Sequence, residues 1–367
     1  MKRYLLLPIV LLSMQTSAQK HQLIIGTYTN TGKSEGIYVY DFDAKTGDTK
    51  QKSVTKGVQN PSYLTVSQDN KFIYSVNEAA ENSAASAFSF DASTAELKFI
   101  NKQPAGADPC YIIADKKHVI TANYSGGNAS VYGIEADGSL GPLKQVVQHS
   151  GKGFNPNRQN SPHVHMALFT PDHKFVLIND LGKDKVYIYK YNEGAARDVL
   201  TPHDSVAITP GAGPRHITFS KDGKFAYLLH EMDGGVTAFS YKDGSLKKIQ
   251  DTKITADGFT GENGAADIHL SPDGKFLYAT NRGSENNITI FSVAKNGLLS
   301  KTGQLSTMGK GPRNFVIDPS GKFLLVAHHY TNDVVVFERN ASNGALKDTG
   351  KRISVGAPVC LVFAPVK

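Results

Sequence analysis

Short apolar stretches separated by turn residues run along nearly the whole chain, and many alternate apolar with polar positions. Gly36–Tyr40, Val186–Tyr189 and Val334–Phe337 are examples rich in β-branched and aromatic residues, and Asp-Gly, Asn-Gly or Thr-Gly pairs follow several such stretches. A period of two over short runs is typical of half-buried strands, and the glycine pairs are typical of the turns between them. Beyond residue 18 no run shows a helical period, so the pattern predicts an all-β protein.

A two-part unit recurs along the chain: a strand beginning near a proline, a turn containing lysine, and a second strand ending in a polar residue. The first part occurs at 61–67, 109–114, 163–171, 213–220, 265–272, 311–319 and 357–365. The second part occurs at 20–27, 71–78, 117–124, 174–181, 224–231, 275–282 and 322–329. Successive units lie about 50 residues apart, which suits the four strands of a propeller blade. The sequence therefore predicts a seven-bladed β-propeller with four-stranded antiparallel blades.

The two ends of the chain carry complementary halves of one unit. The chain enters the pattern in a second part, at 20–27, and leaves it in a first part, at 357–365. We therefore expect Ala357–Pro365 to be the innermost strand of the first blade, next to a strand at Gln22–Gly26. A ring closed in this way has no free inner sheet edge.

The N-terminal segment has a different character. Lys2 and Arg3 precede an apolar run from Tyr4 to Leu12, and small residues up to Ala18 follow. This arrangement is typical of a secretory signal, and the run is too short to span a bilayer, which takes ~20 residues. We expect cleavage after Ala18, an exported protein in the periplasm or outside the cell, and one domain over 19–367. An uncleaved anchor is the alternative.

Composition narrows the range of partners. The chain carries 40 Lys and Arg against 33 Asp and Glu, a net charge of +7, without a basic run of the kind that binds nucleic acid. The mild excess favours a small anionic ligand, and we expect a monomer without a membrane span, nucleic acid partner or cofactor. Cys110 and Cys360 fall in innermost strands of different, non-adjacent blades, too far apart for a disulfide, so both are predicted to be buried free thiols.

Aligning the units places many polar side chains at one mouth of the central channel. The start of the first strand and the end of the second share a face, because the two strands run in opposite directions. The residues at the starts of the first strands include His165, Arg215 and Arg313. The residues at the ends of the second strands are Thr27, Glu78, Tyr124, Asp180, Glu231, Arg282 and His329, and Asn123 directly precedes Tyr124. Converging charges at a channel mouth predict a ligand site. Isolated ion pairs between blades are the structural alternative for any single residue, and His149 is assigned to a surface loop.

Four segments also make the chain recognisable. They are PHVHMALFTPDHKFVLINDLGKDKVYIY (162–189), GPRHITFSKDGKFAYLLHE (213–231), DIHLSPDGKFLYATNRGSENNITIF (267–291) and GPRNFVIDPSGKFLLVAHHYTNDVVVF (311–337). The chain resembles the propeller lactonase family, which includes 6-phosphogluconolactonases and the fungal 3-carboxy-cis,cis-muconate cyclase. The resemblance implies that His165, Arg215, Glu231 and Arg282 are catalytic, and it covers the whole chain beyond the signal.

The resemblance implies a lactonase that converts a sugar-type lactone such as 6-phospho-D-glucono-1,5-lactone to its acid without a metal. His165 or Glu231 would take a proton from water, and arginines would bind the oxyanion and the anionic substrate. Substrate-binding residues are then expected to be Arg313, His163, Asp180, Glu78, Asn123 and His329. Three alternatives stay open: a muconate-type lactone cyclase, a non-enzymatic propeller that binds a ligand or protein, and a Ca²⁺-dependent lactonase using Glu78, Asp180 and Glu231.

Overall fold

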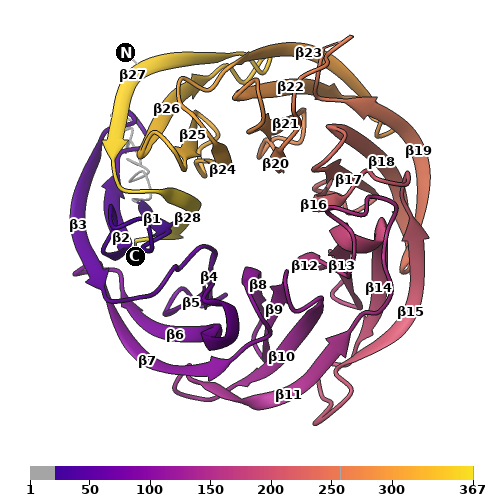
Figure 1. The fold of residues 1–367 in the computed structure, drawn as a ribbon. Helices are drawn as coiled ribbons and strands as arrows, with labels where there is room; N and C mark the ends of the chain where they lie inside the picture. Colours follow the sequence, from indigo (N-terminus) through magenta and orange to yellow (C-terminus); the bar gives the residue numbers. More distant parts are fainter. Residues whose placement is uncertain (1–20, 257, 367) are drawn as a thin grey trace, which may run out of the picture.

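Seven four-stranded antiparallel sheets stand around a central channel in the computed structural model, which describes residues 21–256 and 258–366 (Figure 1). The predicted signal segment, 1–18, lies outside the described residues. The first three blades, from the channel outward, are β28 (Pro358–Pro365), β1 (His21–Thr27), β2 (Gly36–Phe42), β3 (Thr49–Lys56); β4 (Leu64–Val66), β5 (Phe72–Asn77), β6 (Ala84–Asp91), β7 (Glu96–Pro104); and β8 (Pro109–Ala114), β9 (His118–Asn123), β10 (Asn128–Ile134), β11 (Leu140–Gln148).

The remaining four blades follow the same order. They are β12 (Val164–Phe169), β13 (Phe175–Asp180), β14 (Lys185–Tyr191), β15 (Leu200–Ala207); β16 (Pro214–Phe219), β17 (Phe225–His230), β18 (Gly235–Lys242), β19 (Ser245–Lys253); β20 (Ala265–Leu270), β21 (Phe276–Asn281), β22 (Asn287–Val293), β23 (Leu299–Ser306); and β24 (Pro312–Ile317), β25 (Phe323–His328), β26 (Asp333–Arg339), β27 (Leu346–Ser354). Two single-turn 3₁₀ helices, Ala80–Asn82 and Leu181–Lys183, complete the described elements. The structure confirms the seven-bladed β-propeller.

The C-terminal strand closes the ring. β28 pairs antiparallel with β1, in a register that runs from His21 opposite Pro365 to Thr27 opposite Pro358. Its other neighbours are the innermost strands β24 and β4, so the inner strands form an unbroken circle, with yellow β28 beside indigo β1 in Figure 1. The predicted split blade is confirmed.

A repeated turn explains the recurring lysine motif. Ser220 Oγ lies 2.7 Å from Asp222 Oδ1, the amide of Phe225 donates to Ser220 Oγ (2.9 Å), and that of Lys224 donates to Asp222 Oδ1 (3.2 Å). Gly223 takes a φ of 70°, a left-handed conformation that glycine adopts without strain. The same Ser/Thr–Asp pair closes the turns at Ser67, Thr170 and Ser271.

Neighbouring blades are joined through aromatic side chains of the second strand. Tyr227 donates from its hydroxyl to the carbonyl oxygen of Gly297 in the next blade (3.1 Å), and a Cβ on that glycine would lie 2.3 Å from the Phe225 ring. Tyr278 makes the equivalent bond to Gly344 (2.8 Å). The chain has no tryptophan, and neighbouring blades are held together by a tyrosine hydroxyl hydrogen bond and by a phenylalanine ring packed over a turn glycine.

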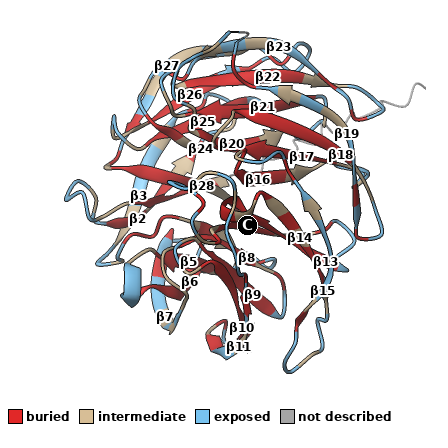
Figure 2. Cartoon of the chain, turned by 45° about the vertical axis from the view of Figure 1, so that its right-hand side comes forward, coloured by how far each residue is buried: buried red, intermediate tan, exposed pale blue. Residues whose placement is uncertain are grey.

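Burial follows the radius of the ring. The inner and middle strands are mostly buried, whereas the outer strands β3, β15 and β19 are mostly exposed or half-buried (Figure 2). Cys110 and Cys360 are both buried and unpaired, as predicted. Among the described residues, no helix has the length and apolar character needed to cross a membrane.

Candidate active site

Six of the seven inner strands have a bulge at the same mouth of the channel, and β4 has none. In β16, Pro214 lies opposite His230 and His216 opposite Leu229, which leaves Arg215 without a partner in the register. His165 and Arg313 are the extra residues of the equivalent bulges in β12 and β24. A bulge redirects one side chain out of the alternating pattern. By position in the blades, the bulge ring consists of Val359, Ser62, Cys110, His165, Arg215, Ala266 and Arg313.

A second ring follows the end of each second strand. Its members share one backbone hydrogen bond, in which the amide just beyond the second strand donates to a carbonyl oxygen before the inner strand; Glu231 to Gly213 (2.8 Å) is one case. The acceptor directly precedes the inner strand in six blades, and in the blade of β4 it is Asn60. This rim ring consists of Tyr28, Glu78, Tyr124, Leu181, Glu231, Arg282 and His329. The two rings are adjacent because the start of the inner strand and the end of the second strand lie side by side in each blade.

Glu231 is the centre of the polar cluster formed by the two rings. Its Oε2 lies 3.0 Å from both Arg215 Nε and Arg282 Nη2, and its Oε1 lies 2.6 Å from Arg158 Nη2. His165 Nε2 is 4.0 Å from Oε2. The structure thus brings together the four residues predicted to be catalytic: His165, Arg215 and Arg282 lie around the carboxylate of Glu231.

The protonation states in this cluster follow from burial and charge. Burial alone would raise the pKa of Glu231, but Arg282 and Arg215 outweigh it and lower that pKa to about 2. Burial, and then the positive charge of Arg215, holds the pKa of His165 well below its usual range. At neutral pH the cluster therefore contains a firmly ionised carboxylate and a neutral imidazole.

Exposure separates the two arginines that share Glu231 Oε2. The Arg215 side chain is 2% exposed, and its Nη1 donates to the carbonyl oxygen of Ala266, whereas the Arg282 side chain is 21% exposed. Burial lowers the pKa of Arg215 to about 10. Arg215 is built into the channel wall, and Arg282 is the one of the pair that a ligand in the channel can reach.

His165 is buried, and its Nδ1 has no hydrogen-bond partner among the described residues. Its ring packs edge-on against Tyr124, with centroids 5.7 Å apart, and against His216, with centroids 5.3 Å apart. Tyr124 in turn stacks on His163 at 4.4 Å. An unpaired buried nitrogen is costly in a packed core and is a reason to look for a function at that residue.

A second group of rim residues lies around Tyr28. The Tyr28 hydroxyl donates to Glu78 Oε2 (2.8 Å), the Arg313 guanidinium carbon lies 5.4 Å from the Tyr28 ring centroid, and the His329 ring lies 5.0 Å from it. Burial, with help from Arg313 and Arg282, lowers the pKa of His329 to about 4. Arg313, Glu78 and His329 therefore lie at the mouth as predicted, and both histidines of the mouth are neutral.

Three predicted ligand-binding residues do not lie in the rings. His163 directly precedes β12 and stacks on Tyr124 of the rim ring. Asp180 and Asn123 are fully buried and occupy the position one residue before the rim ring, where the side chain points into the blade. Asp180 accepts bonds from the His163 amide (2.8 Å) and from His149 Nδ1 (2.7 Å), and Asn123 bonds to Asn128 (2.6 Å). The sequence alignment placed Asp180 beside Glu231, but the true equivalent of Glu231 is Leu181. A one-residue slip moves a side chain to the other face of a strand.

The same slip concealed Tyr28, since the alignment placed Thr27 at the rim. Arg158 was also missed, because it belongs to the irregular segment 149–163 between β11 and β12, which has no counterpart in the repeat. The assignment of His149 to the surface was wrong: it is buried, and Asp180 and the Tyr189 hydroxyl (3.0 Å) hold it.

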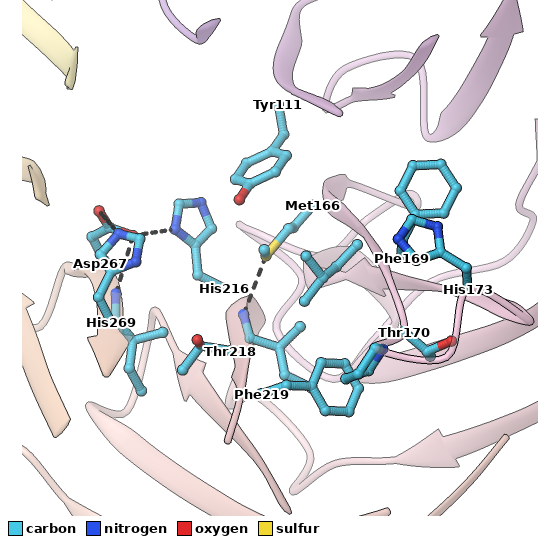
Figure 3. A pocket seen from close by; sticks show the side chains of 14 residues that line it. Tyr111, Met166, Phe169, Thr170, His173, His216, Thr218, Phe219, Asp267 and His269 are labelled. Carbon is cyan, nitrogen blue, oxygen red and sulfur yellow. Dashed lines mark hydrogen bonds and ion pairs between the residues drawn. The ribbon is translucent and has the colours of Figure 1, made fainter. Parts of the chain in front are cut away.

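The opposite end of the channel wall holds a cavity of about 330 Å³ among β12, β16 and β20 (Figure 3). Asp267 is buried there and binds His216 Nδ1 (2.8 Å), His269 Nε2 (2.9 Å) and Asn314 Nδ2 (2.6 Å). His216 also packs against the Arg215 guanidinium at 3.2 Å. This network fixes Arg215 from behind and places a compensating negative charge near it.

The three carboxylates considered as calcium ligands do not form one site. Glu78, Asp180 and Glu231 make separate contacts, with Tyr28, His149 and three arginines respectively. No group of three or more His, Cys, Asp or Glu side chains within 21–256 and 258–366 is arranged to bind one. Burial raises the pKa of the Cys110 thiol to about 12, so that group is protonated and does not serve as a nucleophile.

A propeller with a cluster of arginines at the mouth of its channel is the class that this fold and site define. Residues 22–363 match the family described as "Lactonase, 7-bladed beta-propeller", and the chain belongs to that family.

Three relatives are informative. The chain is 37% identical to a 6-phosphogluconolactonase of Bacillus subtilis over 298 residues, which cover 80% of this chain and 83% of that one. It is 35% identical to a 6-phosphogluconolactonase of Formosa agariphila over 303 residues, 80% of this chain and 86% of the relative. A solved structure of the periplasmic gluconolactonase of Pseudomonas aeruginosa superposes with a TM-score of 0.90 at 36% identity, covering 95% of this chain and all of that chain.

Proposed function

We propose that this protein is a lactonase that opens a sugar 1,5-lactone, 6-phospho-D-glucono-1,5-lactone being the first candidate, at the cluster around Glu231. The observation that carries the proposal is the buried, neutral His165 imidazole 4.0 Å from a carboxylate bound by three arginines. The family and the names of the two 6-phosphogluconolactonase relatives support the choice of substrate.

His165 is the base in this proposal. Its imidazole is unprotonated at neutral pH, whereas Glu231, with a pKa of about 2, holds a proton poorly. Water gives a proton to His165 as its oxygen attacks the lactone carbonyl carbon. The tetrahedral intermediate then collapses, the ring C–O bond breaks, and the protonated imidazole returns the proton to the departing ring oxygen. The product is a hydroxy acid, and His165 ends neutral.

Arg282 is the donor for the oxyanion. It is the more accessible of the two guanidinium groups on Glu231 Oε2, and a fixed positive donor near the developing charge stabilises the transition state. Arg215 holds Glu231 in place and is therefore a positioning residue. Because the arginines depress the His165 pKa, an anionic substrate that offsets their charge raises it and strengthens the base.

We also propose that the protein is exported, with Gln19 as its first residue after cleavage. The support is the basic, apolar and small-residue order of residues 1–18, together with the periplasmic location in the name of the Pseudomonas relative.

The test is lactone turnover by the purified protein, followed as acid release at pH 7 after subtraction of the protein-free rate. We expect catalysed hydrolysis that a chelator leaves unchanged. Loss of activity with chelator supports the calcium-dependent alternative instead. A rate equal to the protein-free rate contradicts the lactonase and leaves the binding propeller as the better account.

A further inference from the structure

Arg158 reaches the site from outside the repeat. It lies in the 149–163 segment, and its Nη2 binds Glu231 Oε1 (2.6 Å) and approaches the Tyr124 hydroxyl (3.4 Å). Its side chain is 46% exposed, compared with 21% for Arg282 and 2% for Arg215. Of the three arginines on Glu231, Arg158 is therefore the one that meets solvent at the mouth.

The backbone beneath Arg158 is firmly anchored. The next residue, Gln159, is fully buried, and its Nε2 donates to the carbonyl oxygen of Leu181 (2.7 Å) and to Asp184 Oδ1 (2.7 Å). Its Oε1 accepts from the amide of Asn155 (2.8 Å), which closes the turn that carries Arg158. The loop thus presents the guanidinium from a fixed position.

The charges at the mouth do not balance. Four guanidinium groups, of Arg158, Arg215, Arg282 and Arg313, are associated with the carboxylates of Glu231 and Glu78, and the buried Asp267 lies behind Arg215. Positive charge remains in excess among these residues even when Asp267 is included. The nearby His165 and His329 are neutral at pH 7, because burial and the arginines lower the pKa of each. A net positive charge at a channel mouth favours an anionic group, such as a phosphate monoester, on the ligand.

Arg158 also has donors to spare. Both of its bonds use Nη2, and among the residues described Nε and Nη1 have no acceptor. A planar guanidinium with two free donor positions suits the two-pronged binding of a phosphate. Nε and Nη1 can therefore bind a phosphate while Nη2 keeps its bond to Glu231 Oε1.

We infer that Arg158 is the specificity-determining residue that binds the phosphate of a phosphorylated lactone and distinguishes it from the uncharged sugar lactone. The inference rests on the proposed function for the reaction, but not for the binding. In the free protein the guanidinium is held by Glu231, and the phosphate becomes its second partner.

The experiment compares Arg158→Ala with the wild type on two substrates, 6-phosphoglucono-1,5-lactone and glucono-1,5-lactone. Losing a charge-assisted pair to phosphate is expected to raise KM for the phosphorylated lactone roughly 10- to 100-fold, with kcat changed far less. Because Arg158 also binds Glu231, both lactones lose the contribution of that ion pair alike, so the discriminating quantity is the ratio of the two KM values. We expect KM for the phosphorylated lactone to rise at least about tenfold relative to KM for the uncharged lactone. Arg197→Ala, at an exposed arginine distant from the channel, is the control, and we expect wild-type KM values for both lactones.

An equal change in KM for both lactones overturns the inference, because Arg158 would then not read the phosphate. The affinities of the protein for 6-phosphogluconate and gluconate, measured by calorimetry, test the phosphate site independently of catalysis. We expect the wild type to prefer the phosphorylated acid and Arg158→Ala to lose that preference. If the preference is present and lost in this way while neither lactone is turned over, the proposed lactonase fails and the phosphate site stands. Equal binding of the two acids by the wild type overturns the site.

Discussion

Glu231→Gln tests the charge arrangement of the site through protein stability. The change preserves the shape of the side chain and removes the charge that faces three arginines. Arg215, which is 1% exposed, then keeps Arg282 as a cationic neighbour without the shared carboxylate between them. Removing one partner of a buried ion pair is destabilising because the other charge stays buried.

The pKa of Glu231 sets the magnitude. A buried carboxyl with a pKa of about 2 in the folded protein and an ordinary 4.5 in the unfolded chain contributes about 3 kcal/mol to folding at pH 7. Because the folded-state pKa is depressed, this contribution is fully present above pH 4.5 and is lost as the pH falls towards 2. At pH 3 roughly half of it or less remains.

Urea unfolding of the wild type and of Glu231→Gln, each at pH 7 and pH 3, measures both values. We expect the variant to be less stable by about 3 kcal/mol at pH 7 and by roughly half as much or less at pH 3. Glu338→Gln, at an exposed glutamate, should change the free energy of unfolding by less than about 0.5 kcal/mol at both pH values. An equal destabilisation by Glu231→Gln at the two pH values would refute the reasoning.

Three further outcomes are expected. Truncation after Gly356 removes β28 from β1 and from the ring of inner strands, so cooperative thermal unfolding should disappear; a sharp transition at the wild-type temperature would contradict the closure. The pH profile of kcat/KM should show no loss of rate between pH 8 and pH 6, since the depressed pKa of His165 keeps the base unprotonated as the pH falls; a midpoint near pH 6.5 would contradict a depressed histidine. N-terminal sequencing of the native protein should read from Gln19 in a fraction outside the cytoplasm, and Met1 retained in the cytosol would exclude export.

The ring of blades was predictable because each blade carries its own signal. The Ser/Thr–Asp turn, the lysine and the aromatic residue are local features, and their repetition fixes the number of blades and the split first blade without knowledge of any long-range contact. The residues of the bulge ring could also be predicted from the sequence, because His165, Arg215 and Arg313 occupy equivalent positions in three copies of the motif.

The rim ring shows where such reasoning ends. In aligning the repeat units we matched polar residues at strand ends, which placed Thr27 and Asp180 in the rim ring. The backbone hydrogen bonds show that Tyr28 and Leu181 are the equivalents of Glu231. Register depends on bulges, and a bulge is a property of two paired strands rather than of one sequence segment. Arg158 could not be predicted for another reason. Its loop has no equivalent in the other repeat units, so its position is known only from the folded structure.

The central claim is that the neutral imidazole of His165 is the base of a lactonase site, and kcat/KM of His165→Ala with 6-phosphoglucono-1,5-lactone at pH 7 tests it most directly. His203→Ala, at an exposed histidine on the outer strand β15, is the matched control and should keep wild-type activity. The account predicts that His165→Ala lowers kcat/KM by ~10²–10⁴, the usual effect of losing an acid–base group, while the thermal unfolding temperature stays close to that of the wild type. A folded His165→Ala protein that retains kcat/KM within about threefold of the wild type would contradict the account, since that is far below the loss expected for a base.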